Sequence, residues 1–220
     1  MKKLIRETIK KLLPGLYYHF HFSQRLIKRR DSFLYQSGWD KSIKEKKPLD
    51  AKGNIIPWTN YAFVAFLDKR IDKNLKIFEF GSGFSTCYFN SRGNEVVSAE
   101  HHKDWISIVN GMLPNESKII QVDGNDSDGY ANSIVSCNQK FDFIFVDGLF
   151  RNDCVVVSID YLTESGVLVL DDSERKDYET SFQLMKEKGF KELTFSSFKP
   201  GAFTLASTTV FYKSNNCLGI

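Results

Sequence analysis

The chain has 220 residues, of which 42% are hydrophobic and 26% are charged, so its length and composition suit one globular domain with an extension. The net charge of +3 hides an asymmetry, because residues 1–50 hold 13 Lys and Arg against 5 Asp and Glu, whereas residues 51–220 hold 17 against 22. The four cysteines form no CxxC pair, which argues against a zinc site or a disulfide framework and favours a reducing cytoplasm. No apolar run reaches membrane-spanning length, and charges interrupt the basic start, so we expect neither a transmembrane helix nor a signal peptide.

The beginning of the chain is predicted to be helical and basic. Apolar residues recur at helical spacing over residues 3–13, and the pair Pro14-Gly15 ends that segment. A second basic helix is expected over residues 23–33. Residues 40–57 are polar, contain two prolines and a glycine, and are predicted to form a loop or linker.

Two interpretations of this basic extension are open. It can lie on an anionic membrane surface or dock a lipid-linked or anionic glycan, or it can pack on the domain as a helical lid with its charges in solvent. The extension carries no known motif for reading nucleic acid, so no nucleic-acid partner is expected. The expected location is the cytoplasm, at the inner face of a membrane if the first interpretation holds.

Strands and helices alternate in the remainder of the chain, after a helical segment over residues 61–69. The predicted strands lie at 75–80, 95–100, 118–122, 141–146 and 166–171, and the predicted helices lie near 85–91, 103–112, 129–138, 151–162 and 174–188. Two final strand-like runs, 191–198 and 208–213, have no helix between them and predict a closing hairpin. We therefore divide the chain into an extension and linker, residues 1–57, and an α/β domain, residues 58–220. The domain is expected to be a doubly wound, mostly parallel seven-stranded sheet with a terminal antiparallel hairpin.

The most informative segment is the glycine turn that follows the first strand. An apolar strand leads directly into this turn, where glycines allow a tight bend and the close approach of a ligand. The helix that follows presents free N–H groups to polar ligand atoms. About twenty residues later a second apolar strand ends in Glu100, which is placed to accept hydrogen bonds from two ribose hydroxyls. The pattern predicts a nucleoside-cofactor site, although such turns also close ordinary strand–helix junctions; the residues expected to contact the cofactor here are Gly81, Ser82, Gly83, Ser85, Thr86 and Glu100.

Glu79 lies inside the first strand and indicates which cofactor the turn binds. A carboxylate in a buried strand is costly unless a partner satisfies it. A nicotinamide site needs no acid there, and Thr86 stands where its third glycine would fall. S-adenosylmethionine carries a cationic amino group and a sulfonium, so Glu79 favours this cofactor and is expected to bind its methionine end. The alternative is that Glu79 pairs with a Lys or Arg of the fold.

Four segments together resemble the class I S-adenosylmethionine-dependent methyltransferases. They are "EFGSGFST", "VVSAEH", "FDFIFVDG" and "GVLVLDDSER", and the resemblance extends from about Trp58 to the C-terminus. The upstream "SGWDKSIKEKKPLDAKGNIIPW" is similar to the lead-in of a bacterial subgroup of such proteins. The resemblance implies a Rossmann-like methyltransferase fold and transfer of a methyl group, with a hydroxyl of a small molecule or a saccharide as the expected acceptor.

The resemblance also implies contacts to the adenine of the cofactor. Asp123, after the third strand, is a candidate acceptor for the adenine amino group, and a simple Asp-Gly turn is the alternative. His101 is a candidate to cover the adenine ring, and a solvated loop histidine is the alternative.

Three acids follow the fourth and fifth strands and are expected to converge. Asp147 follows the fourth strand, at the sheet edge that opens onto the ligand, and is therefore also expected to contact the cofactor; Asp171 and Asp172 end the fifth strand. Such oxygen ligands suit Mg²⁺, and the pattern resembles the metal-dependent O-methyltransferases, which carry an acid–amide pair after the fifth strand. Here Asp172 replaces the amide, so no metal ligand is assigned. Alternatively Asp147 or Asp171 is the general base for the acceptor hydroxyl, and Asp172 is the N-cap of the helix over residues 174–188.

Arg151 is the third residue predicted to act in catalysis. It begins a helix, where a positive charge is mildly unfavourable, and it can bind a carboxylate or phosphate of the acceptor. The alternative is a salt bridge to Asp147, Asp153 or Asp171. Two other functions compete with methyl transfer as a whole: a fold-bearing scaffold without turnover, and a nicotinamide-dependent oxidoreductase.

Overall fold

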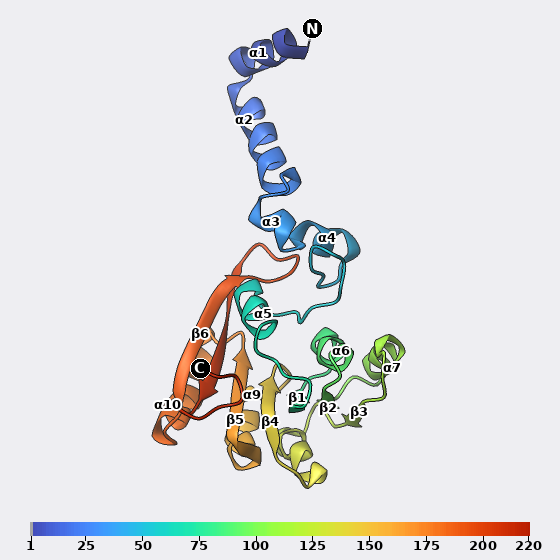
Figure 1. Cartoon of the computed structure of the whole chain (residues 1–220), viewed down its shortest axis with the longest axis vertical. Coiled ribbons are helices and arrows are strands. Elements are labelled where there is room, and N and C mark those ends of the chain that lie inside the picture. The colour runs from blue at the N-terminus through green and yellow to red at the C-terminus, as the bar shows by residue number, and fades with distance from the viewer. Residues whose placement is uncertain (1) are drawn as a thin grey trace.

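A seven-stranded sheet forms the centre of the protein, and a run of N-terminal helices projects from one end of it (Figure 1). The computed structural model describes residues 2–220. The strands lie in the order β3-β2-β1-β4-β5-β7-β6. Their bounds are β1 (Lys76–Phe80), β2 (Glu95–Glu100), β3 (Lys118–Gln121), β4 (Phe141–Val146), β5 (Leu162–Asp171), β6 (Lys191–Phe198) and β7 (Leu205–Tyr212). Strands β1 to β5 are parallel and β7 is antiparallel to both of its neighbours, which confirms the predicted sheet and its closing hairpin.

Helices cover both faces of the sheet. They are α5 (Tyr61–Leu67), α6 (Phe84–Ser91), α7 (Lys103–Met112), α8 (Ser127–Ala131), α9 (Arg151–Ser158) and α10 (Glu179–Glu187), with 3₁₀ turns at Asn132–Cys137, Ile159–Tyr161 and Lys176–Tyr178. Successive side chains of a strand point to opposite faces. Phe78 and Phe80 of β1 therefore join the core cluster that contains residues of α8, α9 and α10, whereas Ile77 joins the cluster with α5 and α6. Glu79 shares the face of Ile77, beneath the start of α6.

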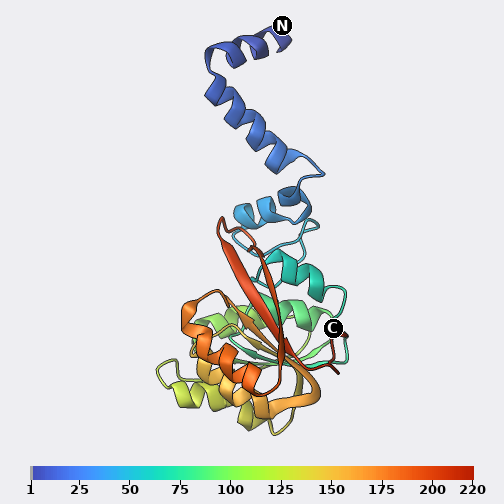
Figure 2. The same cartoon turned by 90° about the vertical axis from the view of Figure 1, so that its left-hand side faces the viewer.

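The N-terminal helices extend away from the sheet, and the first two of them stand clear of it (Figures 1 and 2). They are α1 (Lys2–Leu12), α2 (Pro14–Ser23), a π-helical turn (Gln24–Lys28), α3 (Phe33–Gln36) and α4 (Trp39–Glu45). The first helix was predicted correctly, but the helix expected over 23–33 is only partly correct: residues 24–28 form a π-helical turn that continues α2, and no helix covers 29–32. The second helix begins at Pro14, because the fixed φ and missing N–H of proline suit a first helical turn. The loop predicted over 40–57 is wrong at its beginning, where α4 forms.

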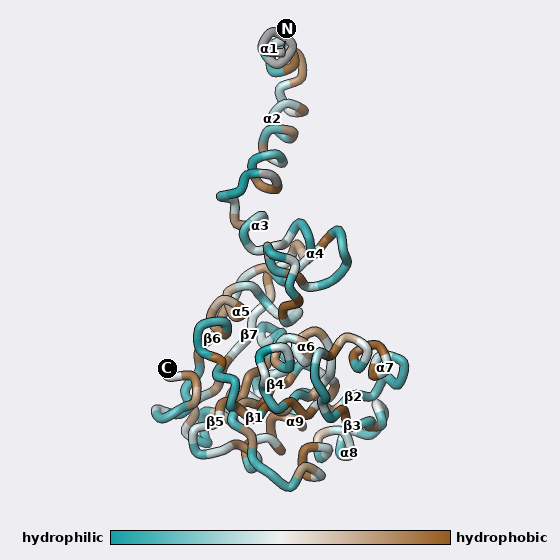
Figure 3. The backbone as a smooth tube through the Cα atoms, turned by 45° about the vertical axis from the view of Figure 1, so that its right-hand side comes forward, coloured by the Kyte–Doolittle hydropathy of each residue, from teal (hydrophilic) through white to brown (hydrophobic). Residues whose placement is uncertain are grey.

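Large apolar side chains of α2 lie in solvent, so these helices do not form a lid over the domain. Leu16, Tyr18, Phe20 and Phe22 are each more than half exposed. The hydropathy-coloured trace in Figure 3 shows hydrophobic and hydrophilic stretches side by side along this segment. Within residues 2–220, no helix combines the length and apolar character needed to cross a membrane.

The segment between the projecting helices and the sheet is tied to the body of the protein. Trp39 and Ile56 are buried in the core cluster of the α5–α6 face. The indole Nε1 of Trp39 donates to the carbonyl of Ala202 at 2.7 Å, and its ring packs edge-on against Phe203. The β6–β7 connection therefore lies against α4. The domain boundary near residue 57 stays a prediction.

Candidate functional site

A cavity of about 370 Å³ opens at the carboxyl ends of β1, β2 and β4, where ligands bind in open α/β sheets. Its lining consists of Trp58, Gly81–Ser85, Glu100, His101, Trp105, Tyr130, Asp147–Leu149 and Arg151. The sequence had predicted eight of these as site residues: Gly81, Ser82, Gly83, Ser85, Glu100, His101, Asp147 and Arg151. The structure brings them together, and it adds Trp105 and Tyr130, which carry no motif of their own.

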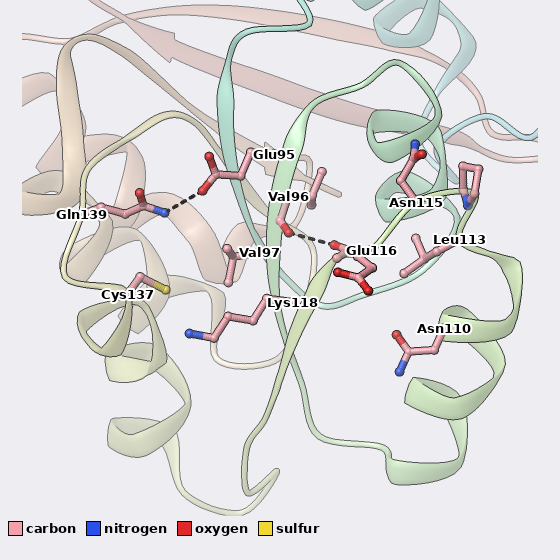
Figure 4. A pocket seen from close by; sticks show the side chains of 12 residues that line it. Glu95, Val96, Val97, Asn110, Leu113, Asn115, Glu116, Lys118, Cys137 and Gln139 are labelled. Atoms are coloured by element: carbon pink, nitrogen blue, oxygen red, sulfur yellow. Dashed lines mark hydrogen bonds between the residues drawn. The ribbon is translucent and has the colours of Figure 1, made fainter.

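A larger hollow, of about 790 Å³, lies at the opposite edge of the sheet (Figure 4). It is open and lies beside the amino ends of β2 and β3, with Glu95, Lys118 and Gln139 around it. Gln139 donates to Glu95 across the hollow at 3.3 Å, so part of its polar lining is already paired. The amino ends of parallel strands are not the edge at which this class of sheet binds ligands. The smaller cavity is therefore the candidate site.

The turn after β1 is packed so closely against the end of β4 that only glycine fits at two positions. Gly81 has φ +94°, and a Cβ there would lie 3.1 Å from the Cα of Gly148. A Cβ on Gly148 would lie 2.0 Å from the hydroxyl of Tyr130. The first turn of α6 is closed by Thr86, whose hydroxyl accepts the N–H of Gly83 at 2.9 Å. Thr86 is fully buried and supports the turn from beneath.

Glu100 is held at the edge of the cavity by main-chain donors. One carboxylate oxygen accepts the N–H of Ser82 at 3.0 Å, and the other accepts the N–H groups of His101 and His102, each at 2.9 Å. The side chain is only 6% exposed. These bonds fix the orientation of the carboxylate before any ligand arrives. Oε1 already accepts two N–H groups, whereas Oε2 accepts one N–H and, at 3.3 Å, the hydroxyl of Ser82, which can rotate away and leave Oε2 open to a ligand hydroxyl.

Aromatic side chains form one wall of the cavity. The indole Nε1 of Trp105 donates to the carbonyl of Ser82 at 2.8 Å. The ring of Phe84 packs against both Trp105 and Trp58, with centroid distances of 5.9 and 5.7 Å. Trp58 is 45% exposed and its Nε1 donates to the carbonyl of Pro200. The β6–β7 connection therefore positions an aromatic ring at the mouth of the site.

Glu79 does not line the cavity. It is fully buried beneath the turn, where one oxygen accepts the hydroxyl of Ser98 at 3.3 Å. The other oxygen, Oε1, has no hydrogen-bond partner among the described residues, and the described part of the chain offers Glu79 no ion pair. Burial raises the pKa of this carboxyl to about 7, against hydrogen bonds from Thr86 and Ser85 that lower it. The alternative interpretation, a pairing of Glu79 with a Lys or Arg, is thus not found within residues 2–220.

Asp123 and His101 lie together in a hollow that adjoins the cavity. Asp123 accepts the N–H of Asn125 at 2.9 Å, so it forms the local turn that the sequence offered as the alternative to a ligand contact. His101 packs against Gly124, where a Cβ would lie 2.8 Å from its ring. Both side chains remain accessible beside the cavity, and an adenine contact by either stays a prediction.

The three acids after β4 and β5 converge as expected. Each of Asp147, Asp171 and Asp172 offers a carboxylate oxygen, and the three oxygens lie within 4.8 Å of one another. We call these three residues the acid cluster. Asp171 is fully buried, and only Asp147 lines the cavity.

The partners of Asp171 come from distant parts of the chain, and sequence reasoning missed them. One oxygen accepts the hydroxyls of Thr59 and Thr208, each at 2.6 Å, and the other accepts Nζ of Lys199 at 2.7 Å. Thr59 precedes α5, Thr208 lies in β7 and Lys199 follows β6. No local spacing relates these positions to the end of β5, so only the folded sheet could identify them.

Arg151 forms one of the salt bridges that the sequence offered as its second interpretation, the one to Asp147. Its Nη2 donates to Asp147 Oδ1 at 2.9 Å, and its Nη1 donates to the carbonyl of Asp171 at 2.6 Å. The Asp147 side chain is 29% exposed. Burial and then the neighbouring Asp171 carboxylate raise the pKa of Asp147, although Arg151 acts in the opposite direction.

Asp172 is not the N-cap of the following helix, contrary to one prediction. It has φ +49°, and α10 begins only at Glu179, after a 3₁₀ turn. Instead its carboxylate pairs with Lys199, with Arg175 at 2.7 Å and with Arg151 at 3.4 Å. Although burial acts in the opposite direction, the hydrogen bond from Lys199 and these charges hold the pKa of Asp172 below its usual value.

Comparisons with known proteins identify the fold. No protein-family model matches the sequence, and no curated protein sequence matches it. Among solved structures, an O-methyltransferase from Bacillus cereus in complex with SAH has a TM-score of 0.58 at 14% identity, over 88% of this chain and 96% of that one. The fold is that of the class I methyltransferases.

Two further structures agree with this fold. The precorrin-6y C5,15-methyltransferase from Geobacter metallireducens has a TM-score of 0.52 at 11% identity and covers 68% of this chain and 86% of its own. A methyltransferase from Pyrococcus furiosus has a TM-score of 0.50 at 14% identity, with 67% and 79% covered. At these identities the likeness establishes the arrangement of the chain, and function has to be argued from the site.

Proposed function

We propose that this protein is an S-adenosylmethionine-dependent methyltransferase that transfers the methyl group to a hydroxyl of a small molecule or a saccharide. The observation that carries the proposal is Glu100, a carboxylate fixed by three main-chain N–H groups beside an open glycine turn. A fixed carboxylate at the end of the second strand, with Oε2 able to exchange the Ser82 hydroxyl for a ligand hydroxyl, is suited to a ribose. The fold shared with methyltransferases favours this cofactor over a nicotinamide, whose third glycine is also absent.

The two sides of the cavity would then bind the two substrates. Gly81, Ser82 and Gly83 approach the cofactor with their backbone, and the aromatic wall with Trp105 covers its apolar parts. Glu79 lies behind the turn and supports the shape of the turn through its hydrogen bond with Ser98, rather than by direct contact with the cofactor. Asp147 lies across the cavity at the end of β4, where the acceptor hydroxyl is expected.

The chain's own residues provide positioning and proton transfer. When bound, S-adenosylmethionine supplies a methyl group on a positively charged sulfur. The aligned walls of the cavity hold the hydroxyl oxygen in line with that methyl group and exclude water. Asp147 accepts the hydroxyl proton as the new O–C bond forms and the C–S bond breaks. The products are S-adenosylhomocysteine and the methylated acceptor. Arg151 orients Asp147 through their salt bridge. Asp171 holds the cluster together from within, out of reach of the cavity.

Calorimetric titration of the purified protein with S-adenosylhomocysteine, with NAD as the parallel ligand, tests the proposal. We expect micromolar binding of S-adenosylhomocysteine and none of NAD. Binding of NAD alone would establish an oxidoreductase instead. Binding of neither ligand would favour a scaffold that keeps the fold without turnover.

A bacterial membrane surface is the partner we propose for the extension, with the protein on the cytoplasmic side. Residues 1–30 hold nine Lys and Arg and one acid, and they carry exposed apolar side chains, among them Leu12, Phe20 and Phe22. This combination suits anionic lipid headgroups. The extension also leaves the body at the end toward which the arrowheads of β4 and β5 point, the end that carries the cavity (Figure 1). A membrane-borne acceptor would therefore meet the open side of the site, and nucleic acid is not part of this proposal.

Vesicle flotation tests this partner. We expect the full chain to float with vesicles that contain anionic phosphatidylglycerol, to float poorly with neutral phosphatidylcholine, and to be released by salt. The double variant Phe20→Ser/Phe22→Ser should lose flotation, whereas Val156→Ser, an exposed apolar position on α9, serves as the matched control. Equal flotation with both lipids, or self-association of the free protein through α2, would contradict the proposal.

A further inference from the structure

The acid cluster lies where metal-dependent relatives of this fold would hold a divalent cation. Three carboxylate oxygens within 4.8 Å of one another are suitable ligands for such an ion. A bound Mg²⁺ or Mn²⁺ needs free oxygen lone pairs in a regular arrangement, with water in the remaining positions. The fit therefore depends on whether the chain itself already uses these oxygens.

Cationic side chains already surround the cluster. The ammonium of Lys199 donates to Asp171 Oδ2 at 2.7 Å and also bonds Asp172 Oδ1, so it bridges two of the three acids. The Lys199 side chain is only 17% exposed. Arg151 bonds Asp147 Oδ1 at 2.9 Å, and Arg175 bonds Asp172 Oδ2 at 2.7 Å. Three positive side chains thus balance three carboxylates, in contrast to an open metal site, which keeps an excess of negative charge.

The remaining oxygen of Asp171 is also occupied. Asp171 Oδ1 accepts two hydroxyls, from Thr59 and Thr208, which gives this buried carboxylate donors on both of its oxygens. A divalent ion could bind Asp171 and Asp172 together only by displacing the Lys199 ammonium from between them. Displacement would leave a mostly buried charge without its partners, which is strongly unfavourable. The residues present do not fit a divalent metal.

We infer that Lys199 is a built-in cation that replaces a divalent metal ion in the acid cluster. The ammonium reaches the cluster from the β6–β7 connection, whose carbonyls at Pro200 and Ala202 accept the indoles of Trp58 and Trp39. The two tryptophans fix this connection, and the connection fixes the cation. Lys199 is thus a positioning residue: it holds the end of β5, and through Arg151 this arrangement sets the side chain of Asp147 at the cavity. This inference concerns cation binding and stands whether or not the protein transfers methyl groups.

Metal titration of the full-length protein and of Lys199→Ala tests the inference without measuring turnover. We expect the wild type to bind no stoichiometric Mn²⁺ by electron paramagnetic resonance and its melting temperature to be unchanged by 1 mM Mn²⁺ or Mg²⁺. Removal of the ammonium should uncover the carboxylates, so Lys199→Ala should bind about one Mn²⁺ and gain at least about 3 °C in melting temperature from the ion. Lys213→Ala, which removes an ammonium that lies over the ring of Phe190, is the matched control and should behave like the wild type.

Two results would overturn the inference. The first is stoichiometric, micromolar Mn²⁺ binding by the wild type that is lost in Asp172→Asn. The second is a folded Lys199→Ala protein that gains no metal response. If Lys199→Ala does not fold, Lys199→Gln keeps a hydrogen-bond donor without the charge, and the same criteria apply to it. The wild-type titration decides the point alone if neither variant folds, because micromolar binding contradicts the inference and absence of binding supports it.

Discussion

The two sides of the cavity hold their carboxylates by different means. Glu100 is satisfied by main-chain N–H groups of its own loop and of the glycine turn, all close in sequence to two strand ends. The acid cluster is satisfied by side chains, and its main cation, Lys199, comes from a hairpin that joins the sheet last in the chain. The first arrangement leaves one carboxylate oxygen, Oε2 of Glu100, able to accept a ligand hydroxyl in place of the Ser82 hydroxyl, whereas the second uses its carboxylate oxygens internally.

This difference indicates that the two sides of the cavity have different roles. Main-chain donors cannot be lost by substitution, so the Glu100 side is suited to a constant ligand such as a cofactor. The acid-cluster side depends on paired charges, and only its outermost member, Asp147, reaches the cavity. Substitutions on the two sides should therefore separate ligand binding from turnover.

The largest effect is expected from Asp147→Asn. The amide keeps the size of the side chain but cannot take the proton from the hydroxyl of the methyl acceptor. With an identified acceptor, turnover should therefore be lower by about 10²–10⁴-fold. Affinity for S-adenosylhomocysteine should stay within about threefold of wild type, because in the proposed function Asp147 contacts the acceptor rather than the cofactor. Steady-state kinetics and calorimetry on the same preparation measure the two quantities. Wild-type turnover in this variant would remove Asp147 from the mechanism.

The opposite pattern is expected from Glu100→Ala. Loss of the fixed carboxylate should weaken S-adenosylhomocysteine binding by at least about 100-fold, equivalent to about 2.7 kcal/mol. The protein should stay folded but melt at a lower temperature, because three main-chain N–H groups lose their acceptor. Glu95→Ala is the matched control, since Glu95 is at the exposed amino end of the same strand, beside the hollow in Figure 4. Retained affinity in the Glu100 variant would show that the ribose site lies elsewhere.

The same comparison explains what could be predicted from the sequence. The sheet, its hairpin and the position of Glu100 follow from strand–turn–helix patterns that are local in the chain, and these were confirmed. The start of α2 at Pro14 was missed because a proline that ends one helix can also begin the next. The partners of the acid cluster were missed for a different reason. Lys199 and Thr59 are each far from Asp171 in the chain, so their contacts exist only after β7 inserts beside β5.

The smallest effect is expected from Glu79→Gln, and it tests a carboxylate that belongs to neither arrangement. Glu79 is fully buried with one oxygen unpartnered among the described residues, and burial raises its pKa to about 7 from an ordinary value of 4.5. The folded protein therefore holds the proton more tightly than the unfolded chain does. As the pH rises from about 4.5 to about 7, ionisation of Glu79 in the unfolded chain should lower the free energy of unfolding of the wild type by at most about 3 kcal/mol. Above that range the contribution of Glu79 should not change further.

The amide introduced by Glu79→Gln carries no charge at either pH, so the variant should lack this part of the pH dependence. Urea unfolding should give the free energy of unfolding of both proteins at pH 5 and pH 8. The difference, variant minus wild type, should be about 2 kcal/mol larger at pH 8 than at pH 5. Because Glu79 lies behind the turn, the affinity for S-adenosylhomocysteine should change by less than about tenfold. A larger loss of affinity, with the pH dependence of stability unchanged, would mean that Glu79 stays ionised and acts on the ligand as Glu100 does. An ionised Glu79 would then lie behind the turn, and two carboxylates, Glu79 and Glu100, would interact with the ligand instead of one.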